Sequence, residues 1–210
     1  YHPSSPTHGG GRAESYVSGD QHYWGVWWGM EPFERYREKV GRFASEFGFQ
    51  SFPSTEYFSA FVEVDNKDLT SAEWKNHQKH PTGFETISEY MQRDYPVPTN
   101  FADYAYVSQL VQARGMKIAI EAQRTRQPYC MGSLYWQFND CWPVVSWSSV
   151  DYFGIPKATH YAVKRAFESI LFTVEEEKDA YRITLINEQL THQNAELIME
   201  LVTFKGEVVK

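Results

Sequence analysis

The sequence predicts an α/β fold, in which strands and helices alternate over residues 20–168. Three short runs have the composition of strands, and a stretch with helical character follows each of them along the chain. This alternation is typical of parallel βα units. From residue 169 onward, runs of strand type follow one another with polar turns and no helix between them, which indicates the beginning of a β-sandwich.

The composition is that of a globular protein, and it excludes two classes of partner. Of the 210 residues, 42% are hydrophobic, which is ample material for a core. The net charge is −7 and no block of Lys or Arg occurs, so the chain lacks the basic footprint of a nucleic-acid-binding protein. No apolar run approaches the roughly 20 residues that cross a bilayer, so we expect no membrane partner. The 7 Trp, 14 Tyr and 14 Phe either fill a large core or line a site for sugars.

The first strand is expected in DQHYWGVWW at 20–28, after a surface loop at 1–19 that is rich in Pro, Gly and Ser. In an extended chain, every second residue from His22 to Trp28 would lie on one side. The polar start of this run indicates that only part of it joins a sheet. A polar stretch follows, with Pro32 near a possible helix start.

The second strand, RFASE at 42–46, ends on a carboxylate, and Pro53 then opens a predicted helix over 54–62. Residues 64–83 are polar and are expected to form a loop, and 84–94 have weak helical character.

The strongest helix is predicted over 102–127, where apolar residues recur at helical spacing with Arg and Gln between them. Gly115 within it costs roughly 1 kcal/mol relative to Ala. The third strand is expected at 131–138, and Pro156 fits the start of a last helix. The strands of the β-sandwich are expected at 171–174, 181–186 and 195–204.

Three parallel strands are too few for a closed (β/α)₈ barrel, which needs eight strands and typically ~250 residues. A small open sheet is the alternative, but it would expose an unpaired edge. The irregular beginning and the unfinished sandwich favour the last part of a TIM barrel at 1–168, followed at 169–210 by the truncated beginning of an immunoglobulin-like β-sandwich. The rest of the same polypeptide, with the upstream barrel strands and further sandwich domains, is then a partner of this chain.

Glu46 is the candidate catalytic residue, because a lone carboxylate at the end of a buried strand is costly unless it faces a pocket. Barrel enzymes place catalytic groups at the carboxyl ends of their strands. The simpler alternative is a structural glutamate bonded to Arg42 or to a backbone amide.

Other reactive residues point to weaker possibilities. His77 and His80 form an H-x-x-H pair in a polar loop with no further ligand nearby, so we expect no metal. Cys130 and Cys141 lie near opposite ends of a predicted strand, too far apart for a disulfide, and are expected to be free thiols.

Three stretches carry a resemblance to a known family. RFASEFGFQSFPS at 42–54, DQHYWGVWW at 20–28 and the Trp-rich stretch at 132–167 are similar to the C-terminal half of the catalytic barrel of β-mannosidases in glycoside hydrolase family 2. The resemblance implies a retaining hydrolase that releases terminal non-reducing β-D-mannose. Within the family motif S-E-[FY]-G-[FY]-Q-S, the nucleophile falls on Glu46.

The family's acid/base glutamate follows an Asn on an earlier barrel strand. The Asn-Glu pair of this chain, Asn187 and Glu188, lies in the predicted sandwich, so the acid/base is expected upstream of this chain and the isolated fragment is expected to be inactive.

The resemblance also implies which aromatic residues meet the sugar. Trp136 resembles the tryptophan that forms the floor of the sugar site, where an aromatic plane stacks on the apolar face of a pyranose. Trp24, His22 and Tyr23 are expected to border the site. No cofactor is expected.

Other readings of the sequence remain open. The SEFG-Q-S motif and the HQKHPTG loop at 77–83 favour a β-mannosidase over a β-galactosidase or β-glucuronidase. A non-catalytic carbohydrate-binding module would also explain the aromatic content. A mannan fragment and an N-glycan core both fit as β-mannoside substrates, and the habits of the family suggest a secreted, periplasmic or lysosomal setting.

Overall fold

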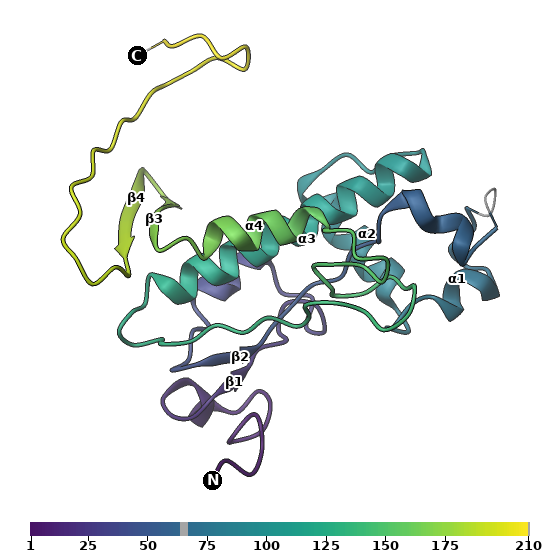
Figure 1. The fold of residues 1–210 in the computed structure, drawn as a ribbon, viewed down its shortest axis with the longest axis horizontal. Coiled ribbons are helices and arrows are strands. Elements are labelled where there is room, and N and C mark those ends of the chain that lie inside the picture. Colours follow the sequence, from purple (N-terminus) through teal and green to yellow (C-terminus); the bar gives the residue numbers. More distant parts are fainter. Residues whose placement is uncertain (64–66, 210) are drawn as a thin grey trace.

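Two parallel strands lie under a layer of helices, with an antiparallel hairpin beyond one end (Figure 1). The computed structural model describes residues 1–63 and 67–209. Its strands are β1 (Gln21–His22) and β2 (Ala44–Glu46), and the antiparallel pair β3 (Ile170–Glu177) and β4 (Ala180–Asn187). Its helices are α1 (Ala72–Asn76), α2 (Gly83–Asp94), α3 (Phe101–Arg124) and α4 (Ala158–Ala166). Helices and sheets are thus both present, as the sequence predicts.

The central sheet is shorter than predicted. β1 and β2 pair in parallel, as the alternation of strands and helices implies, with Gln21 opposite Ala44. The expected strand over 20–28 is wrong beyond residue 22, because the chain turns there and the backbone of Trp27 has a φ of 79°. The predicted alternation of its side chains therefore does not occur.

The third expected strand, 131–138, is reduced to one parallel bridge between Ser133 and Ala44. Its backbone still follows β2: the Ala44 N–H donates to the Gly132 carbonyl at 2.9 Å, and the Ala44 carbonyl accepts from the Leu134 N–H at 2.8 Å. Within the described part of the chain, no strand pairs with the other edge of the 131–138 segment. The hydrogen bonds that a second neighbouring strand would make to this segment are therefore missing. The predicted length of this strand is wrong, but its predicted place beside β2 is confirmed.

The helices follow the predictions more closely. α2, α3 and α4 lie where helical periodicity or Pro156 places them. The helix expected over 54–62 is a 3₁₀ helix, Thr55–Ala60, and another, Phe33–Arg37, follows Pro32. The predicted loop 64–83 contains α1, whose first turn is capped by the Ser71 hydroxyl. Residues 64–66 of the predicted loop lie outside the described part of the chain.

The long helix α3 packs against the segments that precede and follow β2. The Asn100 side chain caps its first turn by accepting the Asp103 N–H at 2.9 Å. Gly115 is required at its position, because a Cβ there would lie 2.4 Å from the buried ring of Phe33. The intrinsic cost of a helical glycine is therefore offset by close packing between α3 and the segment before β2.

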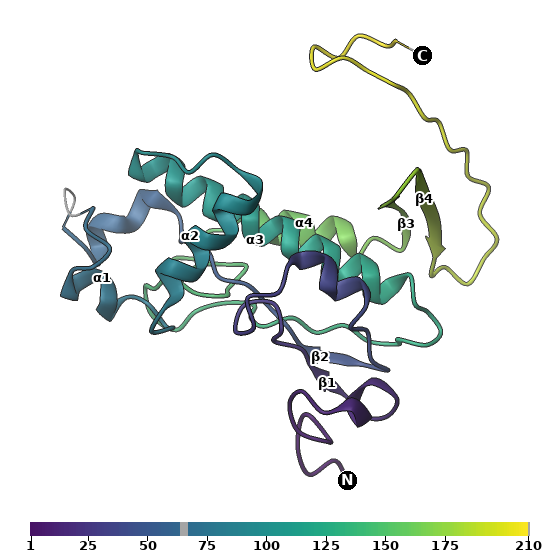
Figure 2. The ribbon, with the colours of Figure 1, turned by 180° about the vertical axis from the view of Figure 1, so that it is seen from behind.

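Polar side chains of α3 bind the chain that continues from β2. Ser108 accepts the Phe52 N–H at 3.0 Å, and the Gln112 amide donates to the Phe49 carbonyl at 2.7 Å and accepts the Ser51 hydroxyl at 2.6 Å. Extended backbone that has no partner strand is satisfied in this way by buried helix side chains. Figure 2 shows α3 with α4 alongside, both lying over the sheet.

The core is unusually aromatic, which accounts for much of the aromatic composition. Its fully buried side chains come from the segment after β1, from the segment after β2 and from all of the first three helices; the largest are Trp27, Phe33, Phe47, Phe49, Phe52, Trp74 and Tyr90. Many of these rings meet edge to face, as Trp27 and Phe49 do at 5.0 Å between centroids.

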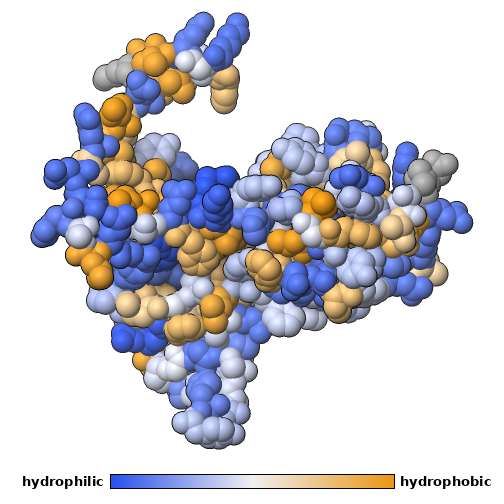
Figure 3. Space-filling model, in the orientation of Figure 1, coloured by the Kyte–Doolittle hydropathy of each residue, from blue (hydrophilic) through white to orange (hydrophobic). Residues whose placement is uncertain are grey.

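The C-terminal part contains a hairpin followed by an extended segment. β3 and β4 confirm the strands predicted at 171–174 and 181–186 and are longer than predicted. The strand expected over 195–204 does not form; one bridge joins Val202 to Val208. Figure 3 shows apolar side chains exposed along this segment, which leads away from the helices. No helix in the described part is long and apolar enough to span a bilayer.

Candidate active site

Glu46 is the last residue of β2, and its side chain is 26% exposed. Because β1 and β2 are parallel, their carboxyl ends meet at the same edge of the sheet. His22 ends β1 opposite Glu46, and the residues that follow both strands therefore gather around the carboxylate. This is the position that the sequence predicts for a functional carboxylate.

Two of the predicted site residues contact the Glu46 carboxylate. The Trp24 indole Nε1 donates a hydrogen bond to Glu46 Oε1 at 3.0 Å, and His22 Nδ1 lies 3.5 Å from Glu46 Oε2. Among the described residues, neither Arg42 nor a backbone amide binds the Glu46 carboxylate, as the structural alternative would have required. A hydrogen bond donor and an imidazole leave the carboxylate both oriented and partly open to solvent.

Tyr23 lies beside the site without directing its side chain to Glu46. Its backbone N–H donates to the Glu46 carbonyl at 3.0 Å, but its hydroxyl donates to Glu31 Oε2 at 2.5 Å. Burial and this hydrogen bond raise the pKa of Tyr23. Its phenol is therefore engaged away from the carboxylate, in contrast to the side chains of His22 and Trp24.

Trp136 is placed close to the segment that follows Glu46. Its N–H donates to the Phe47 carbonyl at 2.8 Å, and its side chain is 45% exposed, as a sugar platform needs to be. Gly48 in the SEFG motif accommodates it, because a Cβ at Gly48 would lie 2.0 Å from the Trp136 carbonyl oxygen. The glycine of the motif thus serves the close approach of two backbones.

An aromatic cluster links Glu46 to the loop that contains His80. Trp24 packs edge to face on Trp147 at 6.1 Å between centroids, and Trp147 packs on Trp27 at 5.6 Å. His80 is buried against Trp27 and Trp28, at 5.3 and 4.1 Å. Burial lowers the pKa of His80, so this imidazole is neutral at neutral pH.

The first histidine of the H-x-x-H pair, His77, has a structural partner. His77 Nδ1 lies 2.6 Å from the Pro143 carbonyl, and its ring lies 5.4 Å from that of Trp142. Lys79 forms an ion pair with Asp140 at 2.8 Å. The HQKH loop is thereby attached to the loop that follows Trp136. No group of three metal-binding side chains occurs among the residues that the structure describes.

The other carboxylates near the site are held by donors. Glu31 accepts the Tyr23 hydroxyl, which lowers the pKa of Glu31 against the opposing effect of burial, and it pairs with Arg35 at 3.2 Å. Asp20 precedes β1 and accepts hydrogen bonds from Ser45 at 2.6 Å and from Ser5 at 2.5 Å. Both carboxylates are poorly suited to act as acids, because a general acid at neutral pH needs a raised pKa.

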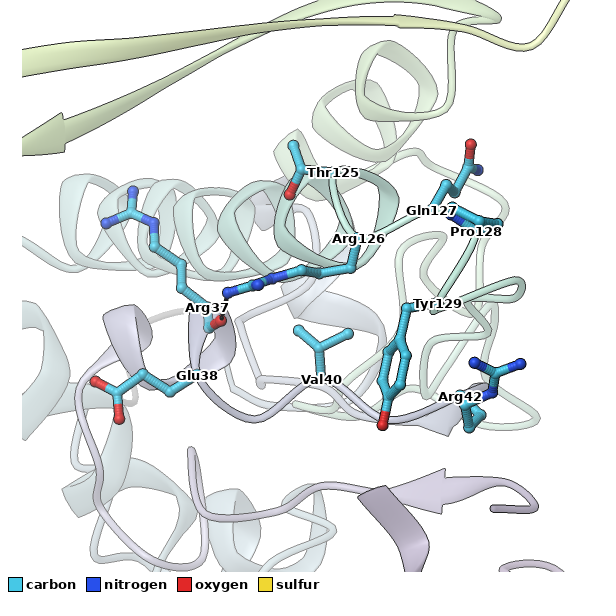
Figure 4. Close-up of a pocket in the computed structure, with 9 residues that line it drawn as sticks. All are labelled: Arg37, Glu38, Val40, Arg42, Thr125, Arg126, Gln127, Pro128 and Tyr129. Carbon is cyan, nitrogen blue, oxygen red and sulfur yellow. Dashed lines mark hydrogen bonds between the residues drawn. The ribbon is translucent and has the colours of Figure 1, made fainter. Parts of the chain in front are cut away.

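A large pocket lies at the other end of β2. It has a volume of about 930 Å³ and is lined by the segment before β2 and by residues 125–129, which follow α3, as Figure 4 shows. Arg42, which precedes β2, stacks over the Tyr129 ring at 4.9 Å in its wall. Because Glu46 is at the carboxyl end of β2 and this pocket at the amino end, the two are separate features.

The cysteines are free, as predicted. Cys130 is buried and Cys141 is exposed. Burial raises the pKa of the Cys130 thiol, so it stays protonated and unreactive at neutral pH.

Sequence reasoning missed two residues near Glu46: Asp20 and Ser5. Asp20 and Ser5 lie 15 residues apart and meet through a loop with no periodicity. The available signals in the sequence were the polar DQH start of the first predicted strand and the Ser of the SEFG motif.

Comparisons with known proteins agree with the resemblance in the sequence. No model of a known protein family matches the chain. β-Mannosidase B of Aspergillus niger is 34% identical over 189 residues, which cover 88% of this chain and 22% of that protein; β-mannosidase B of Aspergillus terreus gives the same values. The chain thus spans about a fifth of the length of these relatives.

Solved structures of similar fold include a β-D-mannosidase from Dictyoglomus thermophilum, with a TM-score of 0.83 and 37% identity over 90% of this chain and 23% of that one. The exo-chitosanase of Amycolatopsis orientalis has a TM-score of 0.60 at 18% identity, and covers 82% of this chain and 21% of that one. The second likeness concerns the fold alone.

Proposed function

Since this chain is a homologue of β-mannosidases over 88% of its length, we propose that the protein containing it is a retaining glycoside hydrolase. It releases terminal non-reducing β-D-mannose from β-mannosides, with Glu46 as the nucleophile. The observation that carries the proposal is the setting of Glu46: a strand-end carboxylate bound by the Trp24 indole and facing His22.

The chemistry of retention requires two carboxyl groups roughly 5–5.5 Å apart. One attacks the anomeric carbon, and the other protonates the leaving oxygen and then activates water. Glu46 must be ionised to attack, and the Trp24 N–H donates a hydrogen bond that orients its carboxylate. Because Asp20 and Glu31 are held ionised by donors, we assign the acid/base role to a glutamate outside these 210 residues.

We also propose that residues 1–168 form the last part of a (β/α)₈ barrel. The segment at 131–138 supports this: it lies beside β2, and Met131, Leu134 and Phe138 are 64%, 56% and 59% exposed. A further βα unit would complete the ladder with its strand and could cover these side chains with its helix. The exposed apolar residues after β4 likewise favour an immunoglobulin-like β-sandwich that includes residues 169–210.

The test is release of nitrophenol from aryl β-mannoside and aryl β-galactoside by the protein that contains this chain. Glu46→Gln should abolish turnover of the mannoside while largely sparing binding, because the amide keeps the shape but cannot attack. Glu38→Gln, in the wall of the separate pocket, is the matched control and should keep wild-type turnover.

Other outcomes would point elsewhere. Galactoside turnover lost in Glu46→Gln would keep the nucleophile and change the sugar. Sugar binding without turnover that survives Glu46→Gln and collapses in Trp136→Ala would identify a carbohydrate-binding module. Unchanged turnover in Glu46→Gln would remove Glu46 from the chemistry.

A further inference from the structure

Asp20 is a buried carboxylate that the proposed reaction does not use. It lies two residues before His22 and is 7% exposed. Four hydrogen bonds reach it: from the Ser5 hydroxyl at 2.5 Å, the Ser45 hydroxyl at 2.6 Å, and the N–H and hydroxyl of Thr7 at 2.7 and 2.8 Å. Burial alone would raise its pKa, but these donors together hold it well below the usual range.

One arm of this network ends on Ser45, the residue before Glu46. Ser45 lies in β2 immediately before Glu46, and its hydroxyl is tied to Asp20 Oδ2. The ionised acceptor makes this hydrogen bond stronger than one between neutral groups. It fixes Ser45, and through the strand backbone it constrains the next residue, Glu46.

The other arm ends on the ring of His22. Because Ser5 donates its single hydroxyl hydrogen to Asp20, its oxygen is left to accept from His22 Nε2, 3.0 Å away. Nε2 of His22 therefore carries a hydrogen, and the ring is oriented with Nδ1 toward Glu46 Oε2 at 3.5 Å. Second partners of this kind commonly set the tautomer and orientation of a functional imidazole.

We propose that Asp20 is a positioning residue for Glu46, acting through Ser45 on the backbone and through Ser5 on the ring of His22. This inference rests on the proposed role of Glu46 as the nucleophile. The N-terminal loop, which supplies Ser5 and Thr7, thereby becomes part of the site. If Asp20 merely fastened this loop, its loss would change stability and leave the reaction of Glu46 unaltered.

The test compares Asp20→Asn, Ser45→Ala and Ser45→Thr in the protein that contains this chain, with Asp179→Asn in the β3–β4 turn as the matched control. Three quantities are measured: kcat and KM for an aryl β-mannoside, the rate at which a 2-deoxy-2-fluoro-β-mannosyl fluoride labels Glu46, and the thermal unfolding temperature.

We expect Asp20→Asn and Ser45→Ala to lower kcat and the labelling rate by about 10- to 100-fold, because small misplacement of a reacting group has effects of this size. KM should stay within about 3-fold, since substrate binding is not the lost interaction. Ser45→Thr keeps the hydroxyl and should recover most of the rate, and Asp179→Asn should match the wild type.

Wild-type kcat and labelling in Asp20→Asn and Ser45→Ala, with activity abolished in Glu46→Gln, would overturn the positioning role and leave the proposed function intact. If Asp20→Asn unfolds below the assay temperature, the Ser45→Ala and Ser45→Thr pair decides by the same criterion. A wild-type protein that neither turns over the mannoside nor is labelled would overturn the proposed function, and the positioning role with it.

Discussion

Buried charges in this chain are tolerated because each is surrounded by partners. Lys157 is the clearest example: it is 1% exposed, and its Nζ donates to the carbonyls of Ser51 and Ser146 at 3.1 and 3.3 Å. Ser51 and Ser146 face each other across an antiparallel bridge, so one ammonium group binds two segments that flank the aromatic cluster. The cost of this arrangement is seen in the pKa of Lys157, which burial lowers to about 8 against the attraction of Asp140 and Asp151.

Stability should therefore depend on pH through Lys157. Between about pH 8 and its usual pKa of 10.5, the folded state has lost the proton while the unfolded state retains it. The unfolded state then binds more protons, so stability rises with pH in this window. Relative to Lys157→Met, the wild type should gain about 3 kcal/mol of unfolding free energy from pH 8 to 10.5. Urea unfolding of both proteins at several pH values measures this difference.

The comparison with Lys157→Met contains its own control. The other Lys and Tyr residues titrate in both proteins, so their contributions cancel in the difference between the two unfolding free energies. A difference that is flat or falls with pH would show that the ammonium is not penalised by burial.

At the level of elements, α3 is the scaffold that joins the parts of the chain. Its polar face binds the backbone after β2, and its last residue, Arg124, reaches the hairpin. Arg124 donates to the Ala166 carbonyl at the end of α4 and pairs with Glu188, after β4, at 3.1 Å. The Arg124 side chain is 4% exposed and that of Glu188 is 37% exposed. A buried guanidinium thus connects two helices to the end of the β3–β4 hairpin.

Arg124→Met should loosen the hairpin. It leaves the Ala166 carbonyl and the Glu188 carboxylate without this donor, and we expect a loss of about 2–4 kcal/mol, near the lower end because Glu188 is partly exposed. Hydrogen exchange of the β3 and β4 amides should accelerate more than that of α2.

Arg182→Met is the matched control, since Arg182 pairs with Glu177 within the hairpin at 62% and 45% exposure. Exposed pairs contribute little, so exchange should stay as in the wild type. Equal exchange rates in both variants would contradict the role given to Arg124.

For the whole molecule, the arrangement of strands and carboxylates predicts that catalytic activity depends on the rest of the polypeptide. In the described residues, Glu46 is the one carboxylate set against Trp24 and His22, and Asp20 and Glu31 are bound by donors. If Glu46 is the nucleophile, as we propose, acid catalysis of leaving-group departure comes from a group outside these residues.

The isolated 210 residues should therefore release no nitrophenol from an aryl β-mannoside. The longer protein, assayed at the same molar concentration, is the positive control, and far-UV circular dichroism checks that the isolated chain keeps its helices. Turnover by the isolated chain that disappears in Glu46→Gln would contradict the proposal that the acid/base lies elsewhere.

Local signals in the sequence determined the elements that depend on local interactions. Helical periodicity placed α2 and α3, Pro156 placed the start of α4, and strand-type runs separated by a polar turn placed β3 and β4. The motif around Glu46 placed the candidate nucleophile at the end of a strand, where the structure has it. These predictions hold because hydrogen bonds in helices and hairpins join residues that are close along the chain.

The tertiary structure alone decided how far each strand extends and which side chains meet at Glu46. Strand length depends on the neighbour that supplies the ladder, so 131–138 remains a single bridge despite its composition. His80, assigned by its polar surroundings to a loop, is buried among tryptophans from distant segments. Asp20, Ser5 and Ser45 meet because β1 and β2 are parallel and the N-terminal loop folds back on them. Contacts between residues far apart in the chain leave no periodic pattern, because their geometry exists only after the strands and helices have packed.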